Sequence, residues 1–257
     1  MTILFEVKNA VAYLSLNRPE KFNAFNREMA LALQQRLDEC DTDKSIRCVY
    51  ITGSGKAFSA GQDLTEIADP DSVGMGKILS EHYNPIVKQI RNLNKPVVAA
   101  VNGVAAGAGA NIALCCDIVV ASESAFFIQA FSKIGLIPDS GGTYFLPRLI
   151  GLQKASALMM LGEKVSAKES ERIGMIYKYF SDEIFQDESK KIAIELSQLP
   201  IQGLAYTKQA LNKSLEQNFW QQLETEDLFQ QKSAATADFK EGVSAFIERR
   251  KPNFNVD

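Results

Sequence analysis

Two glycine-rich turns contain the residues whose types and spacing best suit enzyme chemistry. The first runs from Gly103 to Asn111, and the second, IPDSGG, runs from Ile137 to Gly142. Each follows an apolar run and precedes a predicted helix, and a third turn, KAFSAGQD at residues 56–63, has the same form. Because the first N–H groups of a helix have no partner inside it, such turns can direct unpaired donors at one point.

Asp139 is the only carboxylate in the first two turns, and its neighbours Leu136 and Ile137 are apolar. Burial at such a corner would raise the pKa of the carboxyl, which suits a general base. An aspartate after proline is also common as a plain turn residue or helix cap, and the spacing alone leaves both roles open. Together with directed N–H donors, a single acid predicts chemistry that passes through an enolate.

The composition is that of a soluble globular protein. The chain has 257 residues, 46% hydrophobic and 23% charged, with a net charge of −3. This length predicts one large domain, alone or with an appendage. Mixed charges without a basic surplus argue against nucleic-acid binding. The charge-free stretch Val97–Cys116 is long enough to span a bilayer, but asparagines and glycines interrupt it, so we expect no membrane segment.

Cysteine and histidine usage excludes several catalytic classes. The cysteines Cys40, Cys48, Cys115 and Cys116 form no C-x-x-C pair, and His82 is the single histidine. We therefore expect no metal site, and no Ser-His-Asp or Cys-His mechanism unless His82 supplies the base. Free thiols without a disulfide pattern fit a cytoplasmic location. We expect His82 at the surface, and Cys115 and Cys116 in the core.

Regular alternation of strands and helices predicts an α/β fold for residues 1–198. The predicted elements are a hairpin of Phe5–Val7 and Val11–Leu16, strands at Ile46–Thr52, Pro96–Val101, Ile118–Ala121 and Ala125–Ile128, helices at Arg27–Asp41, Lys77–Leu93 and Ala108–Cys116, and a loop with a short helix at Asp63–Val73. After Pro200 the periodicity is purely helical. Residues 199–257 are therefore expected to form a separate helical region.

Two features have competing interpretations. The Gly103–Gly109 loop lacks the G-x-G-x-x-G spacing of dinucleotide-binding proteins, and it could serve only tight packing of a helix on a strand. A basic cluster near the C-terminus consists of Lys240, Arg249, Arg250 and Lys251. It either complements the dipole of the last helix or binds a phosphate group.

A series of motifs along the whole chain resembles the enoyl-CoA hydratase/isomerase (crotonase) superfamily. The motifs are LNRP at 16–19 with Asn23-Ala24, FSAGQD at 58–63, Lys95-Pro96, VNG at 101–103, Cys116-Asp117, GLIPDSGGT at 135–143 and FKEG at 239–242. The resemblance implies a spiral of ββα turns, then a helical C-terminal trimerisation region, and hence a homotrimer or a dimer of trimers. It also implies an acyl-CoA thioester ligand, with coenzyme A entering as part of the substrate and no separate cofactor.

The resemblance also assigns roles to particular residues. The N–H groups of Ala60 and Ala108 would form an oxyanion hole, and Asp139 would be the acid–base residue. Small residues suit the hole, because the thioester carbonyl must come within hydrogen-bonding distance of the backbone. The expected substrate- and coenzyme-A-binding residues are Lys21, Phe22, Ala24, Asp63, Leu64, Asn84, Phe131, Arg250 and Lys251.

Departures from the family pattern define the expected reaction. Hydratases of the family use two glutamates, and the matching positions here are Asn111 and Phe131. Asp139 is left to move one proton between two carbons. YNP at residues 83–85 with IPDS at 137–140 resembles the phenylacetate-degradation branch that isomerises ring-1,2-epoxyphenylacetyl-CoA and shifts Δ3 to Δ2 enoyl-CoA double bonds. We therefore expect an acyl-CoA isomerase.

Three alternatives stay open from the sequence. A weak enoyl-CoA hydratase would use Asp139 to orient water. A dehalogenase would use Asp139 as a nucleophile, but Phe131 and Asn84 replace the tryptophan and histidine of those relatives. A non-catalytic RNA-binding or scaffold member is disfavoured by the net charge of −3 and by the retained oxyanion-hole segments.

Overall fold

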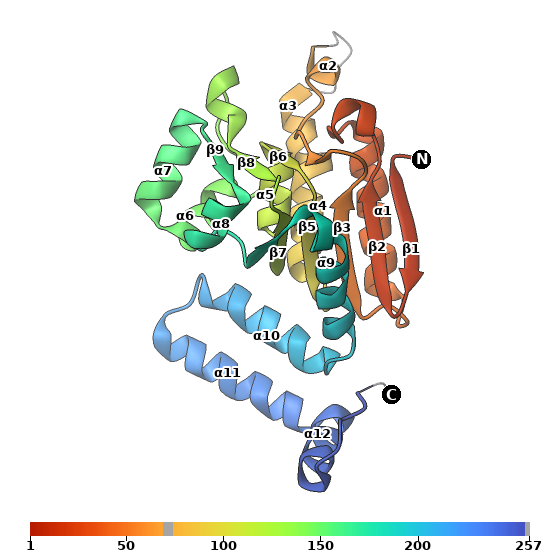
Figure 1. Ribbon diagram of the computed structural model, residues 1–257. Helices are drawn as coiled ribbons and strands as arrows, with labels where there is room; N and C mark the ends of the chain where they lie inside the picture. The colour runs from red at the N-terminus through yellow and green to blue at the C-terminus, as the bar shows by residue number, and fades with distance from the viewer. Residues whose placement is uncertain (69–73, 255–257) are drawn as a thin grey trace.

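The computed structural model describes residues 1–68 and 74–254, which form a strand-bearing body and a projecting helical arm (Figure 1). In this part of the chain, six strands form the larger sheet in the order β1-β2-β3-β5-β7-β10. They are β1 (Ile3–Lys8), β2 (Val11–Leu16), β3 (Cys48–Gly53), β5 (Val97–Val101), β7 (Ile118–Ser122) and β10 (Lys178–Phe180). Among the described strand pairs of this larger sheet, only β1–β2 is antiparallel.

A second, smaller sheet has the order β4-β6-β8-β9 within the described residues. Its strands have three residues each: β4 (Ala57–Ser59), β6 (Val104–Ala106), β8 (Phe126–Ile128) and β9 (Lys164–Ser166). Strands β4, β6 and β8 each follow a strand of the larger sheet and lead toward a helix. The α/β prediction is therefore confirmed, and the chain winds as a spiral of strand–strand–helix turns.

Local sequence signals explain the first elements. The β1–β2 turn is Asn9-Ala10, with φ of 53° and 58°, the left-handed pair that a two-residue hairpin requires. The helix α1 (Arg27–Thr42) begins where the Asn26 side chain accepts the Met29 N–H at 3.0 Å, so the helix predicted at Arg27–Asp41 is confirmed and Asn26 is its N-cap.

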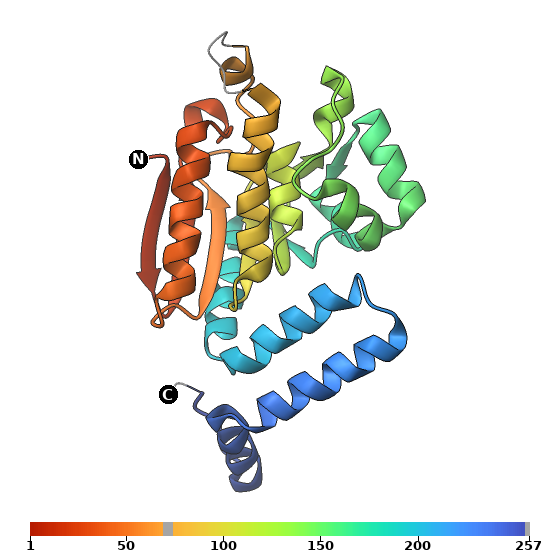
Figure 2. The same cartoon turned by 180° about the vertical axis from the view of Figure 1, so that it is seen from behind.

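Helices cover both faces of the larger sheet. Helix α1 and helix α4 (Asn84–Asn92) lie across one face, as Figure 2 shows, and α9 (Asp182–Ser197) packs on the other. Strand β5 is buried along its whole length, as expected for a parallel strand covered on both sides. All four cysteines are buried, which confirms the core assignment of Cys115 and Cys116.

The single helix predicted at Lys77–Leu93 is interrupted. It consists of α3 (Gly74–Lys77), a π-helical turn at Ile78–Tyr83, and α4. Pro85 has no N–H to continue the α-helical ladder, and the Asn84 N–H donates to the carbonyl of Leu79, five residues back.

The π turn also overturns the prediction for His82. Its side chain is buried at 1% exposure, and Nε2 lies 3.0 Å from Nη1 of Arg27. We expected His82 at the surface because we assumed a helix with 3.6 residues per turn. A π turn has a longer period, and it places the His82 side chain against α1. Burial lowers the pKa of His82.

The loop predicted at Asp63–Val73 contains α2 (Leu64–Ile67), and residues 69–73 lie outside the described residues. The arm consists of α10 (Ile201–Ser214), α11 (Phe219–Ala234) and α12 (Ala237–Glu248) (Figure 1). The buried Lys208 ammonium anchors α10 to the body through Asp117, 2.7 Å away. No helix in the described ranges is both long enough and apolar enough to cross a membrane.

Candidate active site

The three glycine-rich turns meet around an apolar cavity of about 170 Å³. It lies where the short strands of the second sheet end, beside α2 and the π turn. The lining residues are Ala60, Gly61, Gln62, Leu64, Ile67, Met75, Ile78, Tyr83, Gly107, Ala108, Ala130, Phe131, Lys133, Ile134, Leu136 and Asp139. The structure thus brings together the predicted acid, both predicted donor positions and the predicted pocket residues Leu64 and Phe131.

Close packing of two turns sets the position of the first donor. Helix α5 (Ala108–Leu114) starts at Ala108, so the Ala108 N–H has no partner within the helix. A Cβ atom at Gly61, where φ is +88°, would lie 3.4 Å from that nitrogen, and one at Gly109 would lie 2.6 Å from Ser59. Both positions require glycine, because any side chain would push the donor and the turn apart.

The second predicted donor differs from expectation. The Ala60 N–H donates to the backbone carbonyl of Phe22 at 2.9 Å, so it already has a partner. Phe22 and Asn23 both have positive φ, 50° and 54°, and the buried Asn23 side chain holds this loop by donating to the carbonyls of Ser54 and Ala57. The predicted binding residues Lys21, Phe22 and Ala24 lie in this loop, beside the predicted oxyanion hole.

Asp139 lies in the turn before α6 (Gly142–Ile150). Burial raises the pKa of its carboxyl, and the Ser140 hydroxyl, which donates to Oδ1 at 2.9 Å, opposes this effect. The backbone carbonyl of Asp139 accepts the Gly142 N–H at 2.8 Å. A partly buried carboxyl with a raised pKa, facing an apolar cavity, has the properties of a general base.

Asn111 has a structural role that the sequence did not reveal. Its side chain is buried, donates to the Asp139 carbonyl at 2.9 Å and accepts from Gln129 Nε2 at 2.7 Å. A glutamate would have no N–H to donate at this position. Asn111, at the position where the motif resemblance places a hydratase glutamate, therefore adds a hydrogen bond that holds the Asp139 turn against α5.

Tyr83 and Gln62 also line the cavity and were not among the predicted site residues. The Tyr83 hydroxyl donates to Gln62 Oε1 at 2.7 Å. Because the segment is π-helical, Ile78 and Tyr83, five residues apart, both reach the cavity. A period of 3.6 residues would separate them, so only knowledge of the π turn could have placed both here.

The remaining predicted residues lie outside the cavity lining. Asp63 caps α2 and pairs with Arg18 at 2.9 Å, so its carboxylate is occupied within the chain. Asn84 is exposed at the start of α4. Arg250 and Lys251 follow α12, at the end of the molecule opposite α2 (Figure 1).

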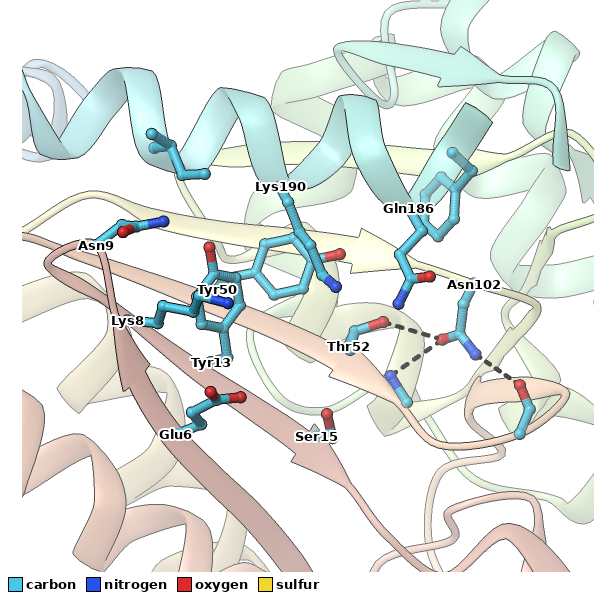
Figure 3. Close-up of a pocket in the computed structure, with 14 residues that line it drawn as sticks. Glu6, Lys8, Asn9, Tyr13, Ser15, Tyr50, Thr52, Asn102, Gln186 and Lys190 are labelled. Carbon is cyan, nitrogen blue, oxygen red and sulfur yellow. Dashed lines mark hydrogen bonds between the residues drawn. The ribbon is translucent and has the colours of Figure 1, made fainter. Parts of the chain in front are cut away.

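A larger cavity of about 610 Å³ lies on the opposite face of the larger sheet. Figure 3 shows Lys190 and Gln186 of α9 pointing into it, Lys190 toward Tyr50 and Gln186 toward Thr52 of β3. None of the predicted site residues lines it in the described part of the chain. The smaller cavity, which contains Asp139, is therefore the candidate active site. The described residues also contain no group of histidine, cysteine and acidic side chains able to hold a metal ion.

Comparisons with known proteins identify the family of the chain. The sequence pattern of the enoyl-CoA hydratase/isomerase family matches residues 6–257. The 1,2-epoxyphenylacetyl-CoA isomerase of Escherichia coli K12 is 44% identical over 255 residues, which cover 98% of this chain and 97% of the relative. The trans-2-decenoyl-[acyl-carrier-protein] isomerase of Streptococcus mutans is 38% identical over 256 residues, with the same two coverages of 98% and 97%.

A solved structure shows that the likeness extends to the whole fold. The enoyl-CoA hydratase of Bacillus anthracis superposes with a TM-score of 0.93 at 29% identity, covering 100% of both chains. The crotonase-like fold expected from the motifs is confirmed, and the protein is an enzyme of this class. The chain belongs to the enoyl-CoA hydratase/isomerase family.

Proposed function

We propose that this protein is an acyl-CoA isomerase that shifts a double bond by moving one proton through Asp139. One observation carries the proposal. Among the described residues that line the cavity, Asp139 has the only carboxylate. In addition, the motif resemblance places Asn111 and Phe131 at the positions where hydratases have glutamates.

In this mechanism the thioester carbonyl lies between the turn at residues 56–63 and the start of α5. The Ala108 N–H, at the positive end of α5, and the Ala60 N–H would stabilise the enolate oxygen as charge develops. Asp139 removes a proton from one carbon next to the conjugated system and returns it to another. Each step leaves the carboxyl either charged or neutral, and a raised pKa brings these two states closer in energy at neutral pH.

The cavity walls support an apolar acyl group and the exclusion of water. Leu64, Ile67, Ile78, Phe131 and Leu136 contribute apolar side chains. Hydration needs an ordered water and a second acid–base group, and the described lining residues offer no second carboxylate. An isomerase acting on an enoyl or ring-epoxide acyl thioester therefore fits better than a hydratase.

The test is incubation with 3-enoyl-CoA and with 2-enoyl-CoA in deuterated water. We expect interconversion of the two isomers with little or no 3-hydroxyacyl product. Asp139→Asn should bind acyl-CoA almost normally and lose about a hundredfold or more in rate, the usual range for a positioned base. Hydrated product as the main species, or full isomerase activity in Asp139→Asn, would reject the proposal.

We also propose that the arm mediates assembly into a homotrimer or a dimer of trimers. Large apolar side chains on α11 and α12 are exposed, including Trp220 at 73% and Phe246 at 86%. Apolar exposure on this scale is typical of an interaction surface. Light scattering should give three or six times the mass of one chain, and a monomer at micromolar concentration would contradict this assignment.

A further inference from the structure

Gln62 and Tyr83 are two polar residues of the cavity lining that have no role in the proposed mechanism. Tyr83 is only 1% exposed, and its ring stacks edge-on against Phe25 with centroids 5.9 Å apart. The ring is therefore fixed, and the only freedom of its hydroxyl is the direction of the proton.

The surroundings of Gln62 determine that direction. Gln62 Nε2 donates to Glu66 Oε2 at 2.8 Å, and the other oxygen of Glu66 accepts the Arg27 N–H at 2.8 Å. Reversing the Gln62 amide would place its oxygen against the Glu66 carboxylate, so the amide oxygen must face Tyr83. The Tyr83 proton therefore lies on the line to Gln62 Oε1, 2.7 Å away.

Because the Tyr83 hydroxyl donates its one proton to Gln62, its oxygen can act toward other groups only as a hydrogen-bond acceptor. We propose that Gln62 is a positioning residue that makes Tyr83 present an acceptor, rather than a proton, to Asp139 and the acyl group. The inference rests on the proposed function, because it concerns the strength of Asp139 as the base. Burial and the charge of Asp139 raise the pKa of Tyr83, consistent with two groups that share one cavity.

The direction of the Tyr83 proton has a chemical consequence. A hydrogen bond donated to the Asp139 carboxylate would stabilise the charged form and weaken the base. An acceptor facing Asp139 instead favours the carboxylic acid that exists once the proton has left the substrate. Gln62 thus preserves the basicity of Asp139 without contacting it.

The test is a double-mutant cycle on the titration of Asp139. The carboxyl is observed by ¹³C NMR in protein labelled at aspartate and is identified by its loss in Asp139→Asn. Gln62→Met keeps the side-chain length but frees the Tyr83 proton, so the midpoint should fall by about one pH unit. In Gln62→Met/Tyr83→Phe no proton is available, and the midpoint should equal that of Tyr83→Phe alone.

The other ionisable groups nearby are common to all four proteins of the cycle. They are Lys133 in the cavity lining, Glu66 behind Gln62, and His82, whose ring faces Arg27. Their titration therefore cancels in the comparison. The acid limb of kcat/KM for isomerisation should move with the NMR midpoint.

Two results would overturn the inference: an unchanged midpoint in Gln62→Met, or a double variant whose midpoint falls below that of Tyr83→Phe by as much as Gln62→Met falls below the wild type. A loss of packing alone would reduce kcat without moving the midpoint. Absence of isomerase activity in the wild-type protein would reject the proposed function but leave the NMR result to decide the role of Gln62.

Discussion

The side-chain amide of Asn111 donates to the backbone carbonyl of Asp139 at 2.9 Å and so ties the start of α5 to the turn that carries the acid. A Cβ atom at Gly142 would lie 2.3 Å from the same amide nitrogen, so the turn could not approach α5 with any larger residue there. These contacts hold the Asp139 turn against α5, so they fix the distance between Asp139 and the Ala108 N–H.

Asn111→Leu should break this tie and leave Gln129 Nε2 without its buried partner. We expect a loss of stability of about 1–3 kcal/mol and a fall in kcat of about tenfold, because Asp139 is no longer held in place. Urea unfolding and steady-state kinetics would measure the two effects. Gln129→Leu is the matched control, since it lowers stability but keeps the Asn111–Asp139 bond. An equal fall in kcat in both variants would mean that stability alone explains it.

The raised pKa of Asp139 predicts that the acid lowers stability at neutral pH. The folded protein holds this proton more tightly than the unfolded chain, whose pKa is near 3.8. The contribution is therefore fully present below that pKa and is lost as pH rises through the folded value. Asp139→Asn should raise the Tm at pH 7, and this gain should shrink as the pH falls through the folded pKa and be gone below a pH of about 4. A lower Tm at pH 7 would contradict this.

Ala108→Val should hold a thioester carbonyl away from the Ala108 N–H. We expect a loss of about 3 kcal/mol in transition-state stabilisation, measured as kcat/KM. Ala60→Gly is the control, because it keeps the backbone N–H and adds no bulk. Circular dichroism must show that Ala108→Val is folded, and wild-type turnover in that folded variant would refute the proposed hole.

The basic residues after α12 separate into two roles. Arg250 pairs with Glu241 at 2.6 Å and with Glu248 at 2.6 Å, and its hydrogen bond lowers the pKa of Glu241 to about 2. No ion pair involves Lys251 within the described residues, and it is exposed. We therefore propose that Lys251, rather than Arg250, binds the 3′-phosphate of coenzyme A, in a neighbouring subunit of the proposed trimer.

Lys251→Ala should accordingly weaken binding of acyl-CoA more than binding of an acyl-pantetheine that lacks this phosphate. The difference should shrink as salt is added, because exposed charges are screened. Arg250→Ala is the matched control and should affect both ligands alike. Calorimetric titrations that show the same loss for both ligands in Lys251→Ala would exclude the phosphate role.

The secondary structure was predicted well for segments whose hydrophobic residues follow a helical or strand period. Asn26 starts α1 as its cap, and the β1–β2 hairpin and the buried β5 strand lie close to the predicted ranges. The three-residue strands β4, β6, β9 and β10 were missed, because so few residues show no alternation, whereas β8 lies within the strand predicted at Ala125–Ile128. The motifs predicted that Asp139 faces the two donor turns. Contacts between side chains far apart in sequence, such as Tyr83 with Gln62, follow from a π turn that has no periodic signature.

The hydrogen bond from Ala60 to the Phe22 carbonyl has a consequence for how the proposed oxyanion hole distinguishes ground state from transition state. A neutral thioester oxygen that takes over the Ala60 N–H merely exchanges one carbonyl acceptor for another of similar strength. An enolate oxygen carries charge and forms a much stronger bond with the same donor. The Phe22 carbonyl thus competes for the Ala60 N–H, and only the charged enolate oxygen gains free energy by displacing it. The Ala60 N–H therefore contributes to the rate more than to substrate affinity.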